Sequence, residues 1–245
     1  MKTLLAALVV LVASAAHAQN PQSNFTPEQQ AELEAMMEKK VETYIAAHPE
    51  ALVASLEAHE KQQAQLAAQP TNEDVVLGDD NAPVTLIEYA SLSCGHCAKF
   101  SNDVFPELKT KYIDTGKVKF ILRDFPLNAS ALHGSILARC AGKDKYYDVV
   151  HTLFAEQEKW AFDQDFMSDL AAYGKQYGVT QEQFDTCIAD KQLQEKIMAR
   201  MQDGSEKFAI NSTPSFVLNG EKTESLNSVA RLTKALDAAL GENKP

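Results

Sequence analysis

A short apolar run, Val84–Ala90, is followed four residues later by Cys94 and then by Cys97, and only a glycine and a histidine separate the two cysteines. The run is rich in β-branched residues and predicts a buried strand. From Ala98 to about Tyr112, apolar residues recur every three or four positions, which predicts a helix. Two cysteines at such a strand-to-helix turn can bind a metal, form a structural disulfide, or exchange disulfides with other thiols.

The spacing of the cysteines disfavours the first two of these roles. A zinc site needs two more ligands at suitable spacing, whereas the remaining cysteines, Cys140 and Cys187, lie singly and far along the chain. A disulfide between Cys94 and Cys97 would close only a two-residue loop and would add little chain entropy. We therefore expect a catalytic dithiol, with no metal and no other cofactor.

The chemistry of thiol exchange assigns different tasks to the two sulfurs. Exchange needs a thiolate, and the unpaired N–H groups at a helix N-terminus stabilise an anion there. Cys94 should be the exposed attacking sulfur with a lowered pKa, and Cys97, one turn further, the shielded resolving thiol. His96 should add a hydrogen-bond donor or a positive charge near the thiolate.

The first 18 residues have the pattern of a secretory signal peptide: Lys2, an apolar run over Leu4–Ala13, and the small-x-small end Ala16–Ala18. We expect cleavage after Ala18 and export to the periplasm, an oxidising compartment in which disulfides persist. The charge of the full chain, −11, argues against binding to nucleic acid.

Residues 19–66 are predicted to form a helical arm. Thr26 begins a capping box with proline at the first helical position, and His48–Pro49 interrupts the helix. Apolar residues form one stripe on the first helix: Leu33, Met37, Val41, Tyr44 and Ile45. The stripe could fold back on its own domain, but its spacing favours self-association, so we expect a homodimer or homotrimer.

The rest of the chain predicts a linker over residues 67–80 and one domain over 81–240. The expected order after the first strand is helix, strand, helical stretch, strand, strand and helix. The elements after the first helix are a strand at Val118–Phe125, helices over about 129–209, a strand after Pro214, a strand at 221–224 and a helix at Leu226–Leu240.

This pattern resembles the thioredoxin superfamily, through the CxxC at a helix start and the later Thr213-Pro214 before a hairpin. The helical insertion, and the stretches ILARCAGKDKYYDVVHTLFAEQEKWA and NSTPSFVLNG, resemble the DsbA branch of exported thiol oxidoreductases. The resemblance implies an α/β thioredoxin fold with an inserted helical subdomain, preceded by an N-terminal helical arm. The arm itself is similar, in composition only, to those of oligomeric ScsC and DsbC proteins.

The resemblance also implies roles for residues outside the CxxC. Glu88 would be a buried acid that relays the proton of Cys97, whereas from the pattern alone it could be a surface glutamate on an edge strand. Pro214 would have a cis peptide bond facing the CxxC, and Thr213 would offer its backbone to an extended substrate.

Cys140 and Cys187 could each be a buried free thiol, but an even pair in an oxidising compartment favours a structural disulfide between them.

The expected function is thiol–disulfide exchange on unfolded or wrongly disulfide-bonded exported proteins, with a membrane redox partner that resets the CxxC. Gly95-His96 resembles the pair of eukaryotic protein disulfide isomerases, whereas the best-known DsbA sequences have Pro-His; Thr213 also favours an isomerase. The prediction is an isomerase or a mixed oxidase and isomerase. The alternatives are a pure dithiol oxidase and a chaperone without redox activity.

Overall fold

The computed structural model describes residues 25–241, so the predicted signal peptide lies outside the described residues. The chain divides into two compact units between Glu60 and Lys61. None of the helices in the described part is both long and apolar enough to cross a membrane.

The arm consists of two helices, α2 (Pro27–Ala47) and α3 (Pro49–Ala67). The predicted capping box is present: the Gln29 N–H donates to the Thr26 hydroxyl at 3.3 Å, and the Thr26 N–H donates to the Gln29 side chain at 2.9 Å. The helix ends at His48, because Pro49 has no N–H with which to continue the ladder.

The apolar stripe of α2 is uncovered. No residue of this helix is buried, and Leu33, Met37, Val41 and Tyr44 are between 40% and 60% exposed. Such a row of exposed apolar side chains is unusual on a single surface helix.

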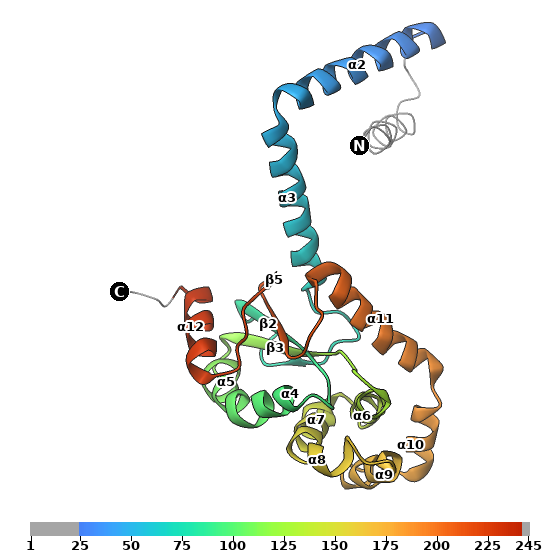
Figure 1. The fold of residues 1–245 in the computed structure, drawn as a ribbon, viewed down its shortest axis with the longest axis vertical. Coiled ribbons are helices and arrows are strands. Elements are labelled where there is room, and N and C mark those ends of the chain that lie inside the picture. Colours follow the sequence, from blue (N-terminus) through green and yellow to red (C-terminus); the bar gives the residue numbers. More distant parts are fainter. Residues whose placement is uncertain (1–24, 242–245) are drawn as a thin grey trace. The chain divides into compact units, whose positions relative to one another are not determined.

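The second unit is built on a five-stranded sheet in the order β1-β3-β2-β4-β5 (Figure 1). The two central strands, β2 and β3, are parallel, and every other pairing is antiparallel. The strands are β1 (Val76–Leu77), β2 (Val84–Ala90), β3 (Val118–Asp124), β4 (Ser215–Leu218) and β5 (Glu221–Lys222). The predicted order of strands is confirmed, with β1 in addition.

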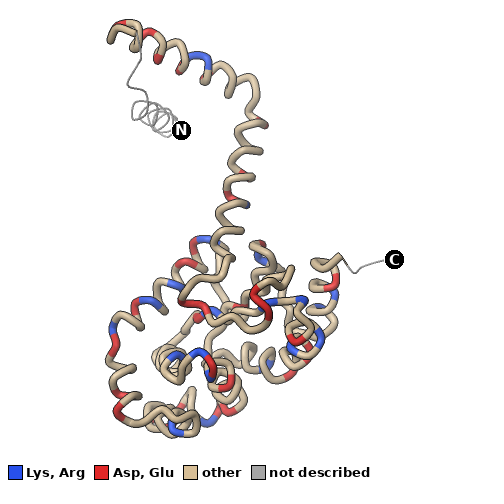
Figure 2. Tube along the Cα trace, turned by 180° about the vertical axis from the view of Figure 1, so that it is seen from behind, with Lys and Arg blue, Asp and Glu red and all other residues tan. Residues whose placement is uncertain are grey.

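A helical run follows β2, and a larger set of helices separates β3 from β4. The first run comprises α4 (Gly95–Lys99), the π-helix η1 (Phe100–Val104), α5 (Phe105–Leu108) and the π-helix η2 (Lys109–Ile113). The insertion comprises α6 (Ala129–Cys140), the 3-10 turn η3 (Lys143–Lys145), α7 (Tyr146–Ala155), α8 (Gln157–Trp160), α9 (Phe166–Gln176), α10 (Gln181–Ile188) and α11 (Lys191–Phe208). The described chain ends with α12 (Val229–Ala239). Figure 2 shows both basic and acidic residues along α11.

Side-chain alternation along the central strands divides the core into two layers. On one face, Leu86 and Phe120 pack with α5, α7 and α12. On the other face, Ile87 and Ile121 pack against Phe208 near the end of α11 and against the end of α3. Because side chains of a strand alternate, Glu88 lies on the same face as Leu86.

The segment 67–80, which the sequence predicts as a linker, packs on the sheet. Its strand β1 pairs with β3, and Asp74 is buried, with bonds to both the Nε and the Nη2 of Arg123 at 3.2 and 3.0 Å. Arg123 also donates to the carbonyl oxygens of Ala67 and Gln69. The guanidinium therefore binds the end of α3 to the sheet, and the folded domain begins before residue 81.

Candidate active site

Cys94 is the N-cap residue of α4, directly before Gly95. Its backbone is extended, and its carbonyl oxygen accepts the N–H groups of Cys97 and Ala98, both at 3.0 Å. The strand β2 is buried along almost its whole length and delivers the chain to this turn. The sulfur of Cys94 thus lies where the free N–H groups of the helix point.

The loop that precedes β4 closes the other side of the site. The Thr213-Pro214 peptide bond is cis, as the resemblance implied. The thiol of Cys94 donates to the carbonyl oxygen of Thr213 at 3.3 Å. The hydroxyl of Thr213 is buried without a hydrogen-bond partner among the described residues.

These contacts lower the pKa of Cys94 to about 5, mainly because the thiol of Cys97 donates a hydrogen bond to the ionised sulfur. Burial opposes the change. Once Cys94 is a thiolate, the sulfur becomes an acceptor, and the otherwise unpartnered hydroxyl of Thr213 and the backbone N–H groups of Cys97 and His96 also stabilise it. Of the two thiols, that of Cys94 is therefore the one that ionises more readily.

Cys97 has the opposite environment. Its side chain is fully buried, and burial raises the pKa of its thiol, with the hydrogen bond to Cys94 and the nearby Glu88 adding to the effect. It therefore remains a thiol while Cys94 is ionised. Cys97 is thus the more shielded of the two sulfurs, but Cys94 is not the exposed sulfur that was expected, because only 9% of its surface is exposed.

Glu88 is buried in the central strand, with 2% of its surface exposed, so the surface alternative is wrong. Its Oε1 atom has no hydrogen-bond partner among the described residues. Burial, together with the negative charge of Cys94, raises the pKa of this carboxyl well above its ordinary value. A neutral carboxylic acid on this face can give a proton to a sulfur or take one from it.

His96 is exposed in the first turn of α4, and its backbone N–H, rather than its ring, contributes to the lowered pKa of Cys94. Among the described residues, the His96 ring has no hydrogen-bond or ion-pair partner.

Sequence reasoning missed Gln157. This buried side chain on α8 donates to the carbonyl oxygens of Leu92 at 2.8 Å and Cys94 at 3.2 Å. It ties the helical insertion to the loop that carries the dithiol. A single glutamine in an amphipathic helix carries no signal that distinguishes it from a surface residue.

Cys140 at the end of α6 and Cys187 on α10 form a disulfide with an S–S distance of 2.06 Å, whereas Cys94 and Cys97 are free thiols. The disulfide joins two helices of the insertion and contributes no atom to the dithiol site. In residues 25–241, no group of three or more histidine, cysteine or acidic side chains is arranged to hold a metal ion.

The parallel β2–β3 pair, the thiolate at a helix start, the cis-proline loop and the buried acid together define the class of dithiol proteins that exchange disulfides. Comparisons with known proteins agree. Residues 70–238 match the thioredoxin family. The chain belongs to this family, and within it to the DsbA-like thiol–disulfide oxidoreductases.

Three known proteins illustrate how similar the chain is to other members of the family. The chain is 31% identical to α-DsbA1 of Wolbachia pipientis, whose crystal structure superposes with a TM-score of 0.67 over 73% of this chain and 96% of that one. It is 35% identical to a Rickettsia bellii protein provisionally named protein-disulfide oxidoreductase, over 70% of this chain and 66% of that protein. BdbD of Bacillus subtilis shares the fold, with a TM-score of 0.61 at 23% identity over 71% of this chain and 97% of that one.

The chain thus spans about two thirds of the length of that Rickettsia relative. The match to α-DsbA1 covers nearly the whole of the other chain, including its helical insertion. The predicted α/β fold with an inserted helical region is confirmed.

Proposed function

We propose that the protein is a periplasmic thiol–disulfide oxidoreductase that acts on cysteines of exported proteins through Cys94 and Cys97, as a disulfide isomerase or as a mixed oxidase and isomerase. The main support for the proposal is that the two thiol pKa values are shifted in opposite directions. That of Cys94 is lowered to about 5, and that of the buried Cys97 is raised. The Cys94 sulfur can therefore attack as a thiolate at neutral pH, while Cys97 remains a protonated thiol.

In isomerisation, the Cys94 thiolate attacks one sulfur of a substrate disulfide. The substrate S–S bond breaks, a mixed disulfide forms, and the other substrate sulfur leaves as a thiolate. A different substrate thiolate then attacks the substrate sulfur of the mixed disulfide and releases Cys94. No electrons are gained or lost overall, so the substrate is rearranged and the enzyme is returned in its dithiol form.

In oxidation, the enzyme begins as the Cys94–Cys97 disulfide. A substrate thiolate attacks the sulfur of Cys94, and Cys97 leaves as a thiolate. A second substrate thiolate then displaces Cys94, so that two electrons pass from the substrate to the enzyme. A membrane redox partner must remove these electrons before the next turnover.

Glu88 is the group that we assign to the proton of Cys97. A buried thiolate is costly, and a neutral carboxyl on the same face of the sheet can protonate it as it leaves. In the reverse direction the carboxylate would take the proton when Cys97 attacks. We assign supporting roles to His96 and Thr213. The backbone N–H of His96 stabilises the Cys94 thiolate, and the backbone of Thr213 would pair with an extended substrate.

Two sequence features of the site favour the isomerase over the pure oxidase. Gly95-His96 lies between the two cysteines, and threonine precedes the cis proline; both resemble isomerases. Equilibration of the mature protein with mixtures of reduced and oxidised glutathione gives its reduction potential, which distinguishes the isomerase from the pure oxidase. A strongly oxidising potential favours the oxidase, and a less oxidising one, with the protein kept reduced in cells, favours the isomerase.

An activity assay tests the redox function itself. Cys94→Ser should abolish both the reduction of insulin and the refolding of a scrambled disulfide substrate. Full suppression of aggregation by this variant, with no redox activity in the unaltered protein, would favour the chaperone alternative and contradict the proposal.

We further propose that the arm assembles two or three copies of the chain through the stripe of α2. The exposure of Leu33, Met37 and Val41 supports this, because apolar side chains at this spacing pack together between helices. Met37→Lys should dissociate the assembly and lower isomerase activity. Ala35→Lys, on the opposite face of the same helix, should change neither. Light scattering that finds the unaltered mature protein monomeric at micromolar concentration would contradict the assembly.

Export remains part of the proposal. The periplasmic expectation rests on the N-terminal pattern and on the kinship with DsbA proteins. Mass spectrometry of the protein recovered from the periplasm should give a chain that begins at Gln19, after cleavage behind Ala18.

A further inference from the structure

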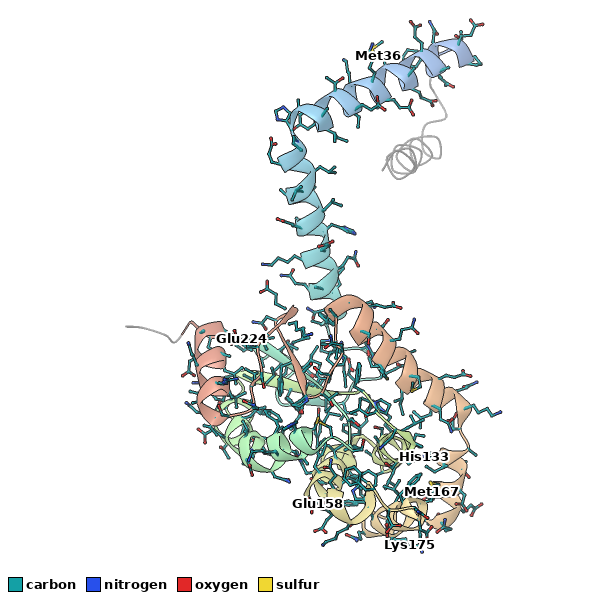
Figure 3. The ribbon with its side chains drawn as sticks, viewed as in Figure 1. Met36, His133, Glu158, Met167, Lys175 and Glu224 are labelled. Carbon is teal, nitrogen blue, oxygen red and sulfur yellow. A yellow bond between two sulfur atoms is a disulfide. The ribbon has the colours of Figure 1, made fainter. Side chains whose placement is uncertain are left out.

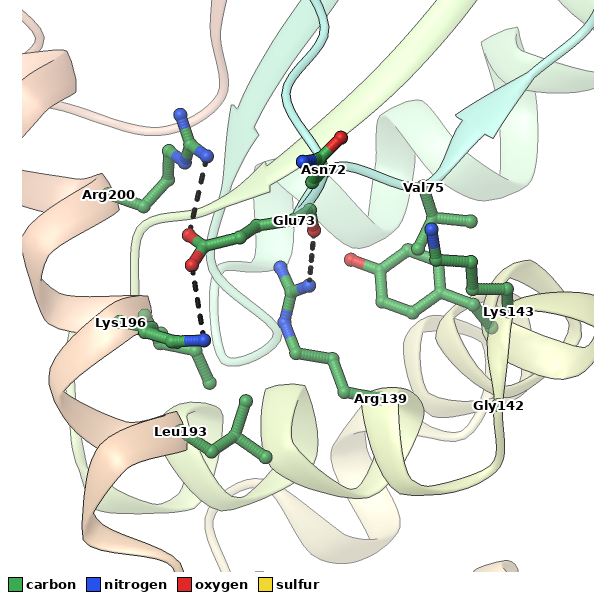
Figure 4. A pocket seen from close by; sticks show the side chains of 11 residues that line it. Asn72, Glu73, Val75, Arg139, Gly142, Lys143, Leu193, Lys196 and Arg200 are labelled. Carbon is green, nitrogen blue, oxygen red and sulfur yellow. Dashed lines mark hydrogen bonds and ion pairs between the residues drawn. The ribbon is translucent and has the colours of Figure 1, made fainter.

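A second concave site lies outside the dithiol centre, between the segment that carries Asn72 and Val75, the end of α6, the start of α7 and one side of α11 (Figure 4). Its volume is about 270 Å³, just below the usual range of small-molecule pockets. None of the residues that line it belongs to the dithiol site.

Positive charge predominates around this cavity. Arg139, Lys143, Lys196 and Arg200 line it, against one carboxylate, Glu73. Glu73 is shared between Lys196 at 3.4 Å and Arg200 at 3.6 Å, so it cannot neutralise both. Arg139 is paired with Asp124, but the four cations still exceed these two carboxylates, which leaves the cavity attractive to an anion.

The other two cations differ in how they are held. Arg139 directs its Nε and Nη2 atoms to Asp124 and its Nη1 atom to the carbonyl oxygen of Glu73, which fixes the guanidinium in place. The backbone carbonyl of Lys143 accepts the N–H of Tyr146, but its side chain forms no hydrogen bond or ion pair with any other residue of the described chain. Its ammonium group is available to a ligand.

A buried donor at the cavity has no partner. Tyr146 lines the cavity with 1% of its surface exposed, and its hydroxyl forms no hydrogen bond within the described part of the protein. Burial, with Asp124 nearby, holds the pKa of Tyr146 well above its ordinary value, so the hydroxyl remains a donor. Leaving such a group unpaired is costly, and an acceptor atom of a ligand would relieve that cost.

The rest of the lining is apolar. Val75, Leu193 and Ile197 contribute hydrocarbon surface, and the ring of Tyr146 adds an aromatic face. A bare inorganic ion would leave this surface in contact with water. The lining instead suits a molecule with a charged head and a compact hydrocarbon body.

We propose that this cavity binds a small organic anion whose oxyanion head, a carboxylate or a phosphate monoester, contacts the ammonium of Lys143 and the hydroxyl of Tyr146, with its apolar body against Leu193 and Ile197. The proposal is independent of the redox function. It assigns a ligand site to a region that joins the end of α6, the insertion helix α11 and the segment before β1.

Titration of the isotope-labelled mature protein, followed by amide NMR, tests the site with three probes: benzoate, phenyl phosphate and the neutral benzyl alcohol. We expect saturable shifts at residues 142–146 and 193–200 with one or both anions, and binding of benzyl alcohol weaker by at least about tenfold. The stronger anion then identifies the preferred head group. No saturable shift by about 10 mM, or equal binding of benzyl alcohol, would overturn the proposal.

Two variants locate the binding. Lys143→Gln and Tyr146→Phe should each lower the affinity for the anion by about tenfold, because each substitution removes one charge-assisted hydrogen bond. Lys175→Gln, on α9 (Figure 3), is the matched control and should leave affinity unchanged. Because the hydroxyl of Tyr146 has no partner to lose, Tyr146→Phe should fold normally and keep its insulin-reducing activity. Unchanged anion affinity in both variants would refute the assignment.

Discussion

The sulfur of Cys94 lies 3.3 Å from the carbonyl oxygen of Thr213, although 119 residues separate them in the chain. The contact brings the proposed attacking atom next to the backbone that we propose binds substrate. A peptide that paired with this backbone as an added strand would carry its own cysteine to the dithiol. The pairing of β2 with β4 holds the two parts of the site together.

Thr213→Val should raise the pKa of Cys94. The substitution keeps the shape and the backbone carbonyl but removes the hydroxyl that stabilises the thiolate. The midpoint of Cys94 alkylation should therefore move upward from about pH 5. Thr186→Val, at an exposed position of α10, serves as the control. An identical midpoint in all three proteins would show that the hydroxyl contributes nothing.

Glu88→Gln should slow exchange by about tenfold to a hundredfold without abolishing it, because the attacking thiolate remains while the proton relay is lost. Stopped-flow measurement of a single turnover, with oxidised and reduced enzyme in turn, gives the rate. A variant as fast as the unaltered protein in both directions would remove Glu88 from the mechanism.

The same substitution should stabilise the protein in a pH-dependent way. The pKa of Glu88 is raised on folding, so the folded state holds this proton more tightly than the unfolded state. Stability is then lost as pH rises above the unfolded value of about 4.3. Glutamine does not ionise, so the gain in melting temperature from Glu88→Gln should be larger at pH 8 than at pH 4. A gain independent of pH would contradict the raised pKa.

Gln157→Leu should destabilise the protein by about 1–3 kcal/mol, because it leaves the buried carbonyl oxygens of Leu92 and Cys94 with one fewer donor. Chemical denaturation measures the loss. Gln176→Leu, at an exposed position of α9, should change stability little. Equal effects of the two substitutions would show that Gln157 does not hold the active-site loop.

Replacing Cys140 and Cys187 with alanine should lower the free energy of unfolding by about 2–4 kcal/mol, since their disulfide spans a separation of 47 residues. Insulin reduction should persist, because the bond lies outside the dithiol site. Peptide mass spectrometry under non-reducing conditions should find the two cysteines linked in the unaltered protein. Alkylation of both without prior reduction would show them to be free.

Much of the site could be predicted from the sequence, because several of its residues lie close together along the chain. Val84–Ala90 and the CxxC that follows predicted the strand, the turn and the helix start, and the interruption of an apolar run marked Glu88. The bonds of Gln157 and Arg123 were not predictable, because both join segments that are distant in the chain. The two-residue strand β1 was missed for a similar reason: it exists only because the edge of β3 offers it a partner.

The central claim is that Cys94 is a thiolate at neutral pH, and its alkylation as a function of pH tests this most directly. The reduced mature protein is treated briefly with iodoacetamide across a range of pH, and peptide mass spectrometry measures the modification of Cys94 separately from that of Cys97. The rate at Cys94 should rise with pH through a midpoint of about 5 and then level off, while Cys97 stays unmodified. A midpoint near that of an unperturbed cysteine, about 8.5, would contradict the account.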